Sequence, residues 1–139
     1  MDVGLPESLV TVVEAATLEA QRLGHRYVGT EHLLLAVCLD PAKVREILVE
    51  LDLDPSDLRS QVDAFVIKSD PLKSEEHIPV SPRALKALAR SIEESQALGA
   101  PEPMLEHVLL MLAEDEDGVA ARVLEVFGID YASIRRFLV

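Results

Sequence analysis

The stretch that decides the fold is QRLGHRYVGTEHLLL, residues 21–35. Its pattern returns 75 residues later, as QALG at residues 96–99 and EHVLL at residues 106–110. The match continues near the C-terminus at an offset of 76, which pairs Leu48, Asp54, Leu58 and Arg59 with Leu124, Asp130, Ile134 and Arg135. A unit of about 70 residues that occurs twice predicts a duplicated helical module with a pseudo-two-fold axis.

Composition favours one domain with a helical core. The chain has 139 residues, of which 49% are hydrophobic, 4% are aromatic and none is Trp. A chain of this length forms one domain, and it has enough apolar residues to bury a core. Because Leu, Val, Ile and Ala supply most of that core, the composition is typical of a helical bundle.

The periodicity of the apolar residues predicts an all-α fold, an eight-helix bundle made of two four-helix repeats. The first repeat covers residues 5–66, the second covers residues 81–139, and a polar linker at residues 67–80 joins them. No segment alternates apolar and polar residues as a half-buried strand does. The predicted helices span residues 7–23, 31–39, 42–51, 56–66, 83–98, 105–114, 118–127 and 131–138.

Short polar side chains mark most of the helix starts, since they accept hydrogen bonds from the free amides of a first turn. The expected caps are Thr30, Asp40 before Pro41, Asp54 before Pro55, Ser81 before Pro82, and Asp130. Gly24 and Gly99 stand where left-handed helix stops are expected.

Charge and cysteine content exclude several classes of function. The net charge is −12, from 25 acidic and 13 basic residues, which disfavours nucleic acid and anionic membranes as partners. Cys38 is the only cysteine and lies in an apolar helical run, so it is interpreted as a small core residue. The absence of disulfides and of an apolar signal segment predicts a cytoplasmic protein. The acidic net charge favours a monomer in isolation.

The motifs of common enzymes are absent. The sequence has no phosphate-binding loop of the Gly-x-x-x-x-Gly-Lys-Ser/Thr type, no Gly-x-Ser-x-Gly and no His-Glu-x-x-His zinc motif. Glu31 and Glu106 form a repeated carboxylate pair, but no nucleophile accompanies them. Glu31 and His32 are adjacent and point about 100° apart on a helix, which disfavours a shared metal. We therefore expect no enzymatic activity, no metal and no cofactor.

Residues 23–37, LGHRYVGTEHLLLAV, resemble the hallmark of the Clp N-terminal (Clp repeat) domain, which precedes the AAA+ ATPase rings of ClpA, ClpC and ClpB. The second copy matches less fully. Residues 81–84, SPRA, and residues 118–124, GVAARVL, are similar to the ClpC version. The resemblance covers nearly the whole chain.

The resemblance implies a module that binds substrates, degradation tags or adaptor proteins and passes them to an AAA+ Clp ATPase, in cis or in trans. In ClpC-like members each repeat binds phosphoarginine, with the Glu of Gly-Thr-Glu-His on the guanidinium and a hydroxyl near the first helix on the phosphate. The residues carried over are Glu31, Glu106, Thr30 and Ser81. Pro6 replaces the expected hydroxyl residue in repeat 1, and Met104-Leu105 replace Gly-Thr in repeat 2.

Three alternatives stay open at this point. The domain is either part of a Clp ATPase or a free-standing relative that modulates the machine. A free-standing form could instead act as a decoy that sequesters cyclic-peptide antibiotics or phosphoarginine proteins. Finally, Glu31 and Glu106 could be helix-start carboxylates favoured by the helix dipole and nothing more.

Overall fold

The structure, a computed structural model, describes residues 4–38, 43–73 and 77–139. These residues form eight α-helices and no strand, which confirms the all-α prediction. The helices are α1 (Glu7–Arg22), α2 (Thr30–Val37), α3 (Lys43–Glu50), α4 (Pro55–Phe65), α5 (Pro82–Ala97), α6 (Leu105–Glu114), α7 (Val119–Val126) and α8 (Tyr131–Arg135).

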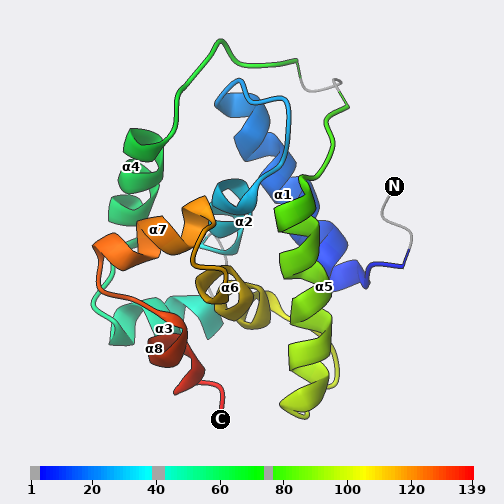
Figure 1. Cartoon of the computed structure of the whole chain (residues 1–139), viewed down its shortest axis with the longest axis vertical. Coiled ribbons are helices and arrows are strands. Elements are labelled where there is room, and N and C mark those ends of the chain that lie inside the picture. Colours follow the sequence, from blue (N-terminus) through cyan, green and yellow to red (C-terminus); the bar gives the residue numbers. More distant parts are fainter. Residues whose placement is uncertain (1–3, 39–42, 74–76) are drawn as a thin grey trace.

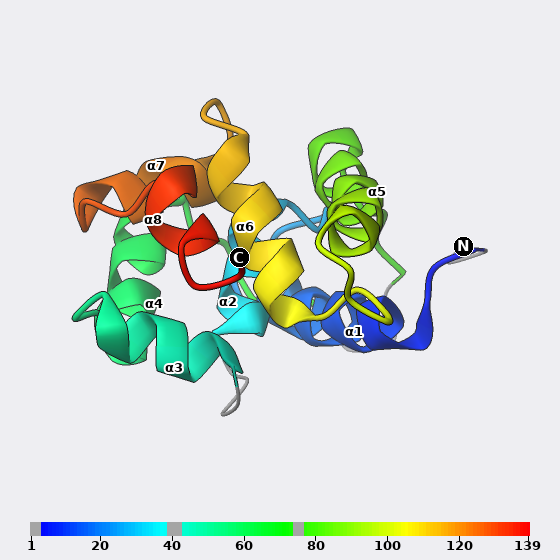
Figure 2. The same ribbon diagram turned by 90° about the horizontal axis from the view of Figure 1, so that it is seen from below.

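Helices α2 and α6 occupy the middle of the molecule (Figure 1). Helices α1 and α5 lie on one side of this pair, and α3, α4, α7 and α8 lie on the other (Figure 2). This arrangement follows from the sequence of α2, because a helix that is apolar on all sides must be covered on all sides. All eight residues of α2 are buried.

The two repeats interlock through their third helices. Helix α1 packs on α2 as α5 packs on α6, so the first helix pair is the same in both halves. Helix α7 of the second repeat, however, packs on α2, and α3 of the first repeat packs on α6. Any cleft at the start of α2 is therefore built from both repeats.

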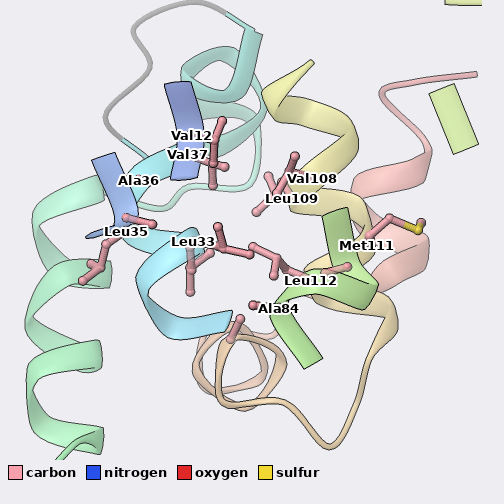
Figure 3. Close-up of a cluster of buried hydrophobic side chains, with 14 of the residues drawn as sticks. Val12, Leu33, Leu35, Ala36, Val37, Ala84, Val108, Leu109, Met111 and Leu112 are labelled. Atoms are coloured by element: carbon pink, nitrogen blue, oxygen red, sulfur yellow. The ribbon is translucent and has the colours of Figure 1, made fainter. Parts of the chain in front are cut away.

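The core is aliphatic and continuous across the two halves. Leu33 of α2 lies in one cluster with Val108, Leu109 and Leu112 of α6 (Figure 3). Leu34 and Leu109 are fully buried at equivalent positions of the two central helices. Cys38 is partly buried against this core, and desolvation raises the pKa of its thiol to about 12.

Most helix starts and stops follow the sequence signals. Side chains of Asp54, Ser81 and Asp130 accept hydrogen bonds from amides in the first turns of α4, α5 and α8. Gly24 and Gly99 have φ of 74° and 77°, the left-handed conformation expected after α1 and α5.

Three expectations about helix ends need comment. Thr30 does not cap α2, because the helix begins one residue earlier than predicted and Gly29 is the N-cap residue. Helix α8 ends at Arg135 instead of residue 138, and the chain continues in turns. The predicted start at Asp40-Pro41 lies outside the described residues.

The segment between the repeats is tied to the end of α1. The amides of Ser69 and Leu72 donate to the carbonyls of Leu23 and Gln21, each at 2.9 Å. A Cβ at residue 24 would lie 2.5 Å from the Asp70 carbonyl oxygen, so this approach requires Gly24. Further on, Val28 and Val80 form an isolated parallel bridge.

None of the helices in the described ranges has the length and apolar character needed to cross a membrane.

Truncating the central leucines tests this core. We expect Leu34→Ala and Leu109→Ala each to lower the free energy of unfolding by about 2–5 kcal/mol, because each leaves a cavity between packed helices. Leu18→Ala is the matched control: Leu18 is 61% exposed on α1, so its loss should change stability by less than about 0.5 kcal/mol. Urea unfolding followed by circular dichroism measures all three, and equal effects would contradict the assignment of the core.

Candidate functional site

The repeated histidine is a capping residue at the start of each central helix. Nδ1 of His32 accepts a hydrogen bond from the Gly29 amide at 2.8 Å, and Nδ1 of His107 accepts one from the Met104 amide at 2.9 Å. Both amides are at N-cap positions, and both histidines are buried. A buried amide without an acceptor costs free energy, which explains why the same side chain stands at both positions.

His32 begins a chain of three hydrogen bonds with a defined tautomer. Because its Nδ1 is an acceptor, the ring proton is on Nε2, which faces Nδ1 of His25 at 2.8 Å. His25 then donates from Nε2 to the carbonyl oxygen of Ile67 at 2.7 Å. Both rings are neutral in this arrangement. Burial, followed by His25 and Arg22, lowers the pKa of His32 to about 3.

One ligand atom each from His25, Glu31 and His32 lies within 4.8 Å of the others. The sequence analysis missed His25 here, because it lies in the loop before α2 and not at helical spacing. A metal-binding histidine donates from its second ring nitrogen, but Nδ1 of His32 accepts from Gly29. The tautomer places a proton on the nitrogen that would bind the metal. The geometry therefore favours a hydrogen-bonded pair over a ligand set.

Glu31 carries a carboxylate in a fixed position. The residue is only 3% exposed, and its Oε2 accepts a hydrogen bond from the Tyr27 hydroxyl at 2.9 Å. Burial and the Glu31 carboxylate raise the pKa of Tyr27 to about 12. A Cβ at residue 29 would lie 2.5 Å from the Glu31 Oε1, so Gly29 makes room for this carboxylate.

Thr30 links the start of α2 to the start of α7. Its hydroxyl accepts a hydrogen bond from the Ala120 amide at 3.3 Å, and Ala120 lies in the first turn of α7. Thr30 thus accepts a hydrogen bond at a helix start, but that helix, α7, belongs to the second repeat. A Cβ at Gly118 would lie 3.3 Å from the Thr30 hydroxyl oxygen, so the two helix starts are closely packed.

Ser81 brings the start of α5 to the same place. Its amide donates to the Val28 carbonyl at 2.8 Å, and its hydroxyl accepts from the Ala84 amide at 3.2 Å. The loop before α2 therefore lies directly beside the first turn of α5.

These contacts enclose a cleft of about 410 Å³, which we call the Glu31 cleft. Helices α2, α5 and α7 all begin at its wall, so the partial positive charges of three helix N-termini face it. Arg83 adds a cation, held by Asp115 at 2.7 Å. The lining residues are Tyr27, Gly29, Thr30, Glu31, Ser81, Pro82, Arg83, Asp117, Gly118 and Val119.

Three of the four residues singled out in the sequence, Thr30, Glu31 and Ser81, meet in this cleft. Glu106 does not line it; it lies half-buried in the first turn of α6. The sequence analysis assigned Ser81 to the repeat of Glu106, whereas the structure places it beside Thr30 and Glu31 because the repeats interlock. It also missed Tyr27 and Arg83, which no local motif marks as site residues.

The fold and the cleft define a duplicated all-α domain with one polar cleft at the junction of its repeats. The chain belongs to the family of the Clp repeat (R) N-terminal domain, whose family model matches residues 5–102. The N-terminal domain of the chaperone ClpD from Arabidopsis thaliana has the same fold: TM-score 0.73 and 21% identity, over 99% of this chain and 96% of that one.

Two longer proteins are similar in sequence. A ClpA homologue of Porphyra purpurea, an ATP-binding subunit of the ATP-dependent Clp protease, is 36% identical over 93% of this chain and 16% of its own length. The chloroplastic chaperone protein ClpC2 of Oryza sativa subsp. japonica is 37% identical over 93% of this chain and 14% of its own length. The chain thus spans about a sixth of the relatives that it matches.

The histidine pair gives the fold a pH dependence. The pKa of His32 is about 3 in the folded protein and near 6.5 when unfolded, so between these values the unfolded chain binds the extra proton. Stability should therefore fall as the pH is lowered below 6.5. Between pH 7 and pH 5 we expect His32 to contribute a loss of about 2 kcal/mol.

His32→Gln is the control variant, because glutamine at this position also accepts the N-cap amide but does not titrate. Urea unfolding of both proteins at pH 7 and pH 5 isolates the contribution of His32. The same loss of stability in the variant would show that His32 is not responsible.

Proposed function

We propose that this domain is a docking module of a Clp unfoldase system. It binds protein substrates, degradation tags or adaptor proteins and has no catalytic activity of its own. Membership of the Clp repeat N-terminal family supports this, as do the functions of the longer relatives, a protease ATP-binding subunit and a chaperone. The AAA+ ATPase acts with it in cis or in trans, since the 139 residues contain no phosphate-binding loop.

The ligand that suits the Glu31 cleft carries both a cation and an anion. A carboxylate binds a planar guanidinium through two parallel hydrogen bonds, and Glu31 holds such a carboxylate in place. Helix N-termini and hydroxyl groups bind phosphate, and three helices begin at the cleft beside Ser81. Phosphoarginine combines the two groups in one side chain. The convergence of three helix starts on a buried carboxylate is the observation that carries this proposal.

The net charge of −12 does not prevent binding of a phosphorylated ligand. Charges separated by more than about 8–10 Å are largely screened at physiological ionic strength. Close to the phosphate, the relevant charges are those of the cleft itself. There the partial positive charges of three helix N-termini offset Glu31 and Asp117, while the charge of Arg83 is paired with Asp115.

A modulator or decoy would have the same cleft and differ in its partners. A pull-down with assembled Clp ATPase–protease complexes distinguishes a docking module or modulator from a decoy. A docking module or modulator is retained by the complex, whereas a decoy binds the small ligand and is not retained.

Glu31→Gln tests the role of the carboxylate. The substitution keeps the shape of the side chain and removes the charge that holds the guanidinium. We expect the affinity for a phosphoarginine peptide to fall about 10- to 100-fold, as the loss of a charge-assisted pair of hydrogen bonds predicts. Isothermal titration calorimetry measures this.

Glu50→Gln is the charge-matched control, because Glu50 is exposed at the end of α3 and away from the cleft lining. It should leave the affinity unchanged. If the wild-type protein binds the phosphoarginine peptide no better than the same peptide with unmodified arginine, the phosphoarginine proposal is wrong.

A pair of variants at Ser81 tests the phosphate contact without disturbing the helix start. Both Asp and Asn are good N-cap residues, so Ser81→Asp and Ser81→Asn should keep α5 intact. The added carboxylate should repel the phosphate and lower affinity at least about tenfold relative to Ser81→Asn. Equal affinities of the two variants would place the phosphate away from Ser81.

A further inference from the structure

The surface around Glu106 lacks several features that form the Glu31 cleft. We propose that the domain holds a single ligand of this kind, in the Glu31 cleft, and that the corresponding surface around Glu106 is not a second site. This inference rests on the proposed function and concerns its stoichiometry. At an offset of 75, Tyr27, Gly29, Thr30, Ser81 and Arg83 correspond to Glu102, Met104, Leu105, Pro6 and Ser8.

The first difference is steric. Gly29 allows the Glu31 carboxylate to lie against the backbone, at a place where a Cβ would be only 2.5 Å from Oε1. Met104 is the N-cap residue of α6 and has both a Cβ and a long side chain. Glu106 consequently has no access to the position that Glu31 adopts. Glu106 is half-buried, whereas Glu31 is 3% exposed.

The second difference is the group that holds the carboxylate. Tyr27 donates a hydrogen bond to Glu31 from four residues earlier. Its counterpart Glu102 is an acid at the same spacing from Glu106. An ionised carboxylate accepts hydrogen bonds but cannot donate one. Glu106 therefore lacks the donor that orients Glu31.

The third difference lies on the side of the phosphate. Ser81 offers a hydroxyl, and its amide donates to Val28. The equivalent Pro6 has neither a hydroxyl nor an amide hydrogen. Ser8 compensates, since its hydroxyl donates to the Pro103 carbonyl at 2.6 Å and so joins α1 to the loop before α6. The Ser8 hydroxyl therefore already has a hydrogen-bond partner within the protein.

The surface around Glu106 and the Glu31 cleft also differ in charge. Arg83 lines the Glu31 cleft, but its counterpart is the uncharged Ser8. The residue that corresponds to Pro82 is Glu7, an exposed acid at the start of α1. Glu7, Glu102 and Glu106 thus give the second surface three carboxylates, and their charge opposes a phosphorylated ligand. The two related surfaces are suited to different ligands.

Calorimetric titration with a phosphoarginine peptide tests the inference on the whole chain. We expect one ligand bound per domain, an affinity at least tenfold weaker in Glu31→Gln, and no change in Glu106→Gln. Glu31 and Glu106 occupy equivalent places in their helices, so the two substitutions are matched in size, charge and position.

The outcomes distinguish this inference from the function on which it rests. Two ligands per domain, or a loss of affinity or stoichiometry in Glu106→Gln, would overturn the inference and leave the proposed function intact. No binding by the wild-type protein would overturn this inference and the phosphoarginine proposal, and would leave the docking of other partners standing.

Gly29→Ala tests the steric argument separately. The new Cβ must displace the Glu31 carboxylate, so affinity should fall at least tenfold although Glu31 is still present. Circular dichroism and thermal unfolding report whether the variant is folded. A folded Gly29→Ala protein with wild-type affinity would overturn the argument that Met104 disables the second surface.

Discussion

The structure depends on the complete burial of α2. Five other helices, α1, α4, α5, α6 and α7, cover it, so its first turn lies inside the protein. The N-cap amide of Gly29 is then shielded from water and needs an acceptor from the protein. His32 supplies one at Gly29, and His107 supplies its equivalent in α6. The repeated Glu-His pair is therefore first a means of starting each central helix, since each histidine accepts a hydrogen bond from its N-cap amide.

That burial also explains why the Glu31 cleft belongs to both repeats. Helix α7 of the second repeat packs against α2, and the Thr30 hydroxyl accepts a hydrogen bond from the Ala120 amide in the first turn of α7. The start of α5 is held beside it by Ser81 and Val28. Three helix starts meet as a result of packing, and their dipoles favour the buried Glu31 carboxylate. Tyr27 holds that carboxylate in one position before any ligand binds, which is the preorganisation that the proposed site needs.

The sequence predicted local features well and long-range ones less well. The periodicity of the apolar residues and the residues typical of helix ends predicted eight helices. The caps at Asp54, Ser81 and Asp130 depend only on neighbouring residues. Thr30 was assigned as a cap of its own helix, but its hydroxyl serves α7, 90 residues away. The 75-residue offset between the repeats shows which positions are equivalent in sequence, but it does not show which side chains contact one another. Thus the sequence named three residues that line the cleft, Thr30, Glu31 and Ser81, while their grouping required the packing of the two repeats.

Comparison of the two halves separates the requirements of folding from those of binding. His32 and His107 are identical because each accepts a hydrogen bond from its own N-cap amide, and Leu34 and Leu109 are both fully buried at equivalent positions. Around the cleft the halves differ, as Gly29 and Met104 do. Glu106 is the instructive case, since an acid in a first turn is stabilised by the helix dipole without any ligand. Glu31 has in addition a hydrogen-bond donor in Tyr27, the space left by Gly29 and a cleft beside it, and these are the features on which the proposed binding depends.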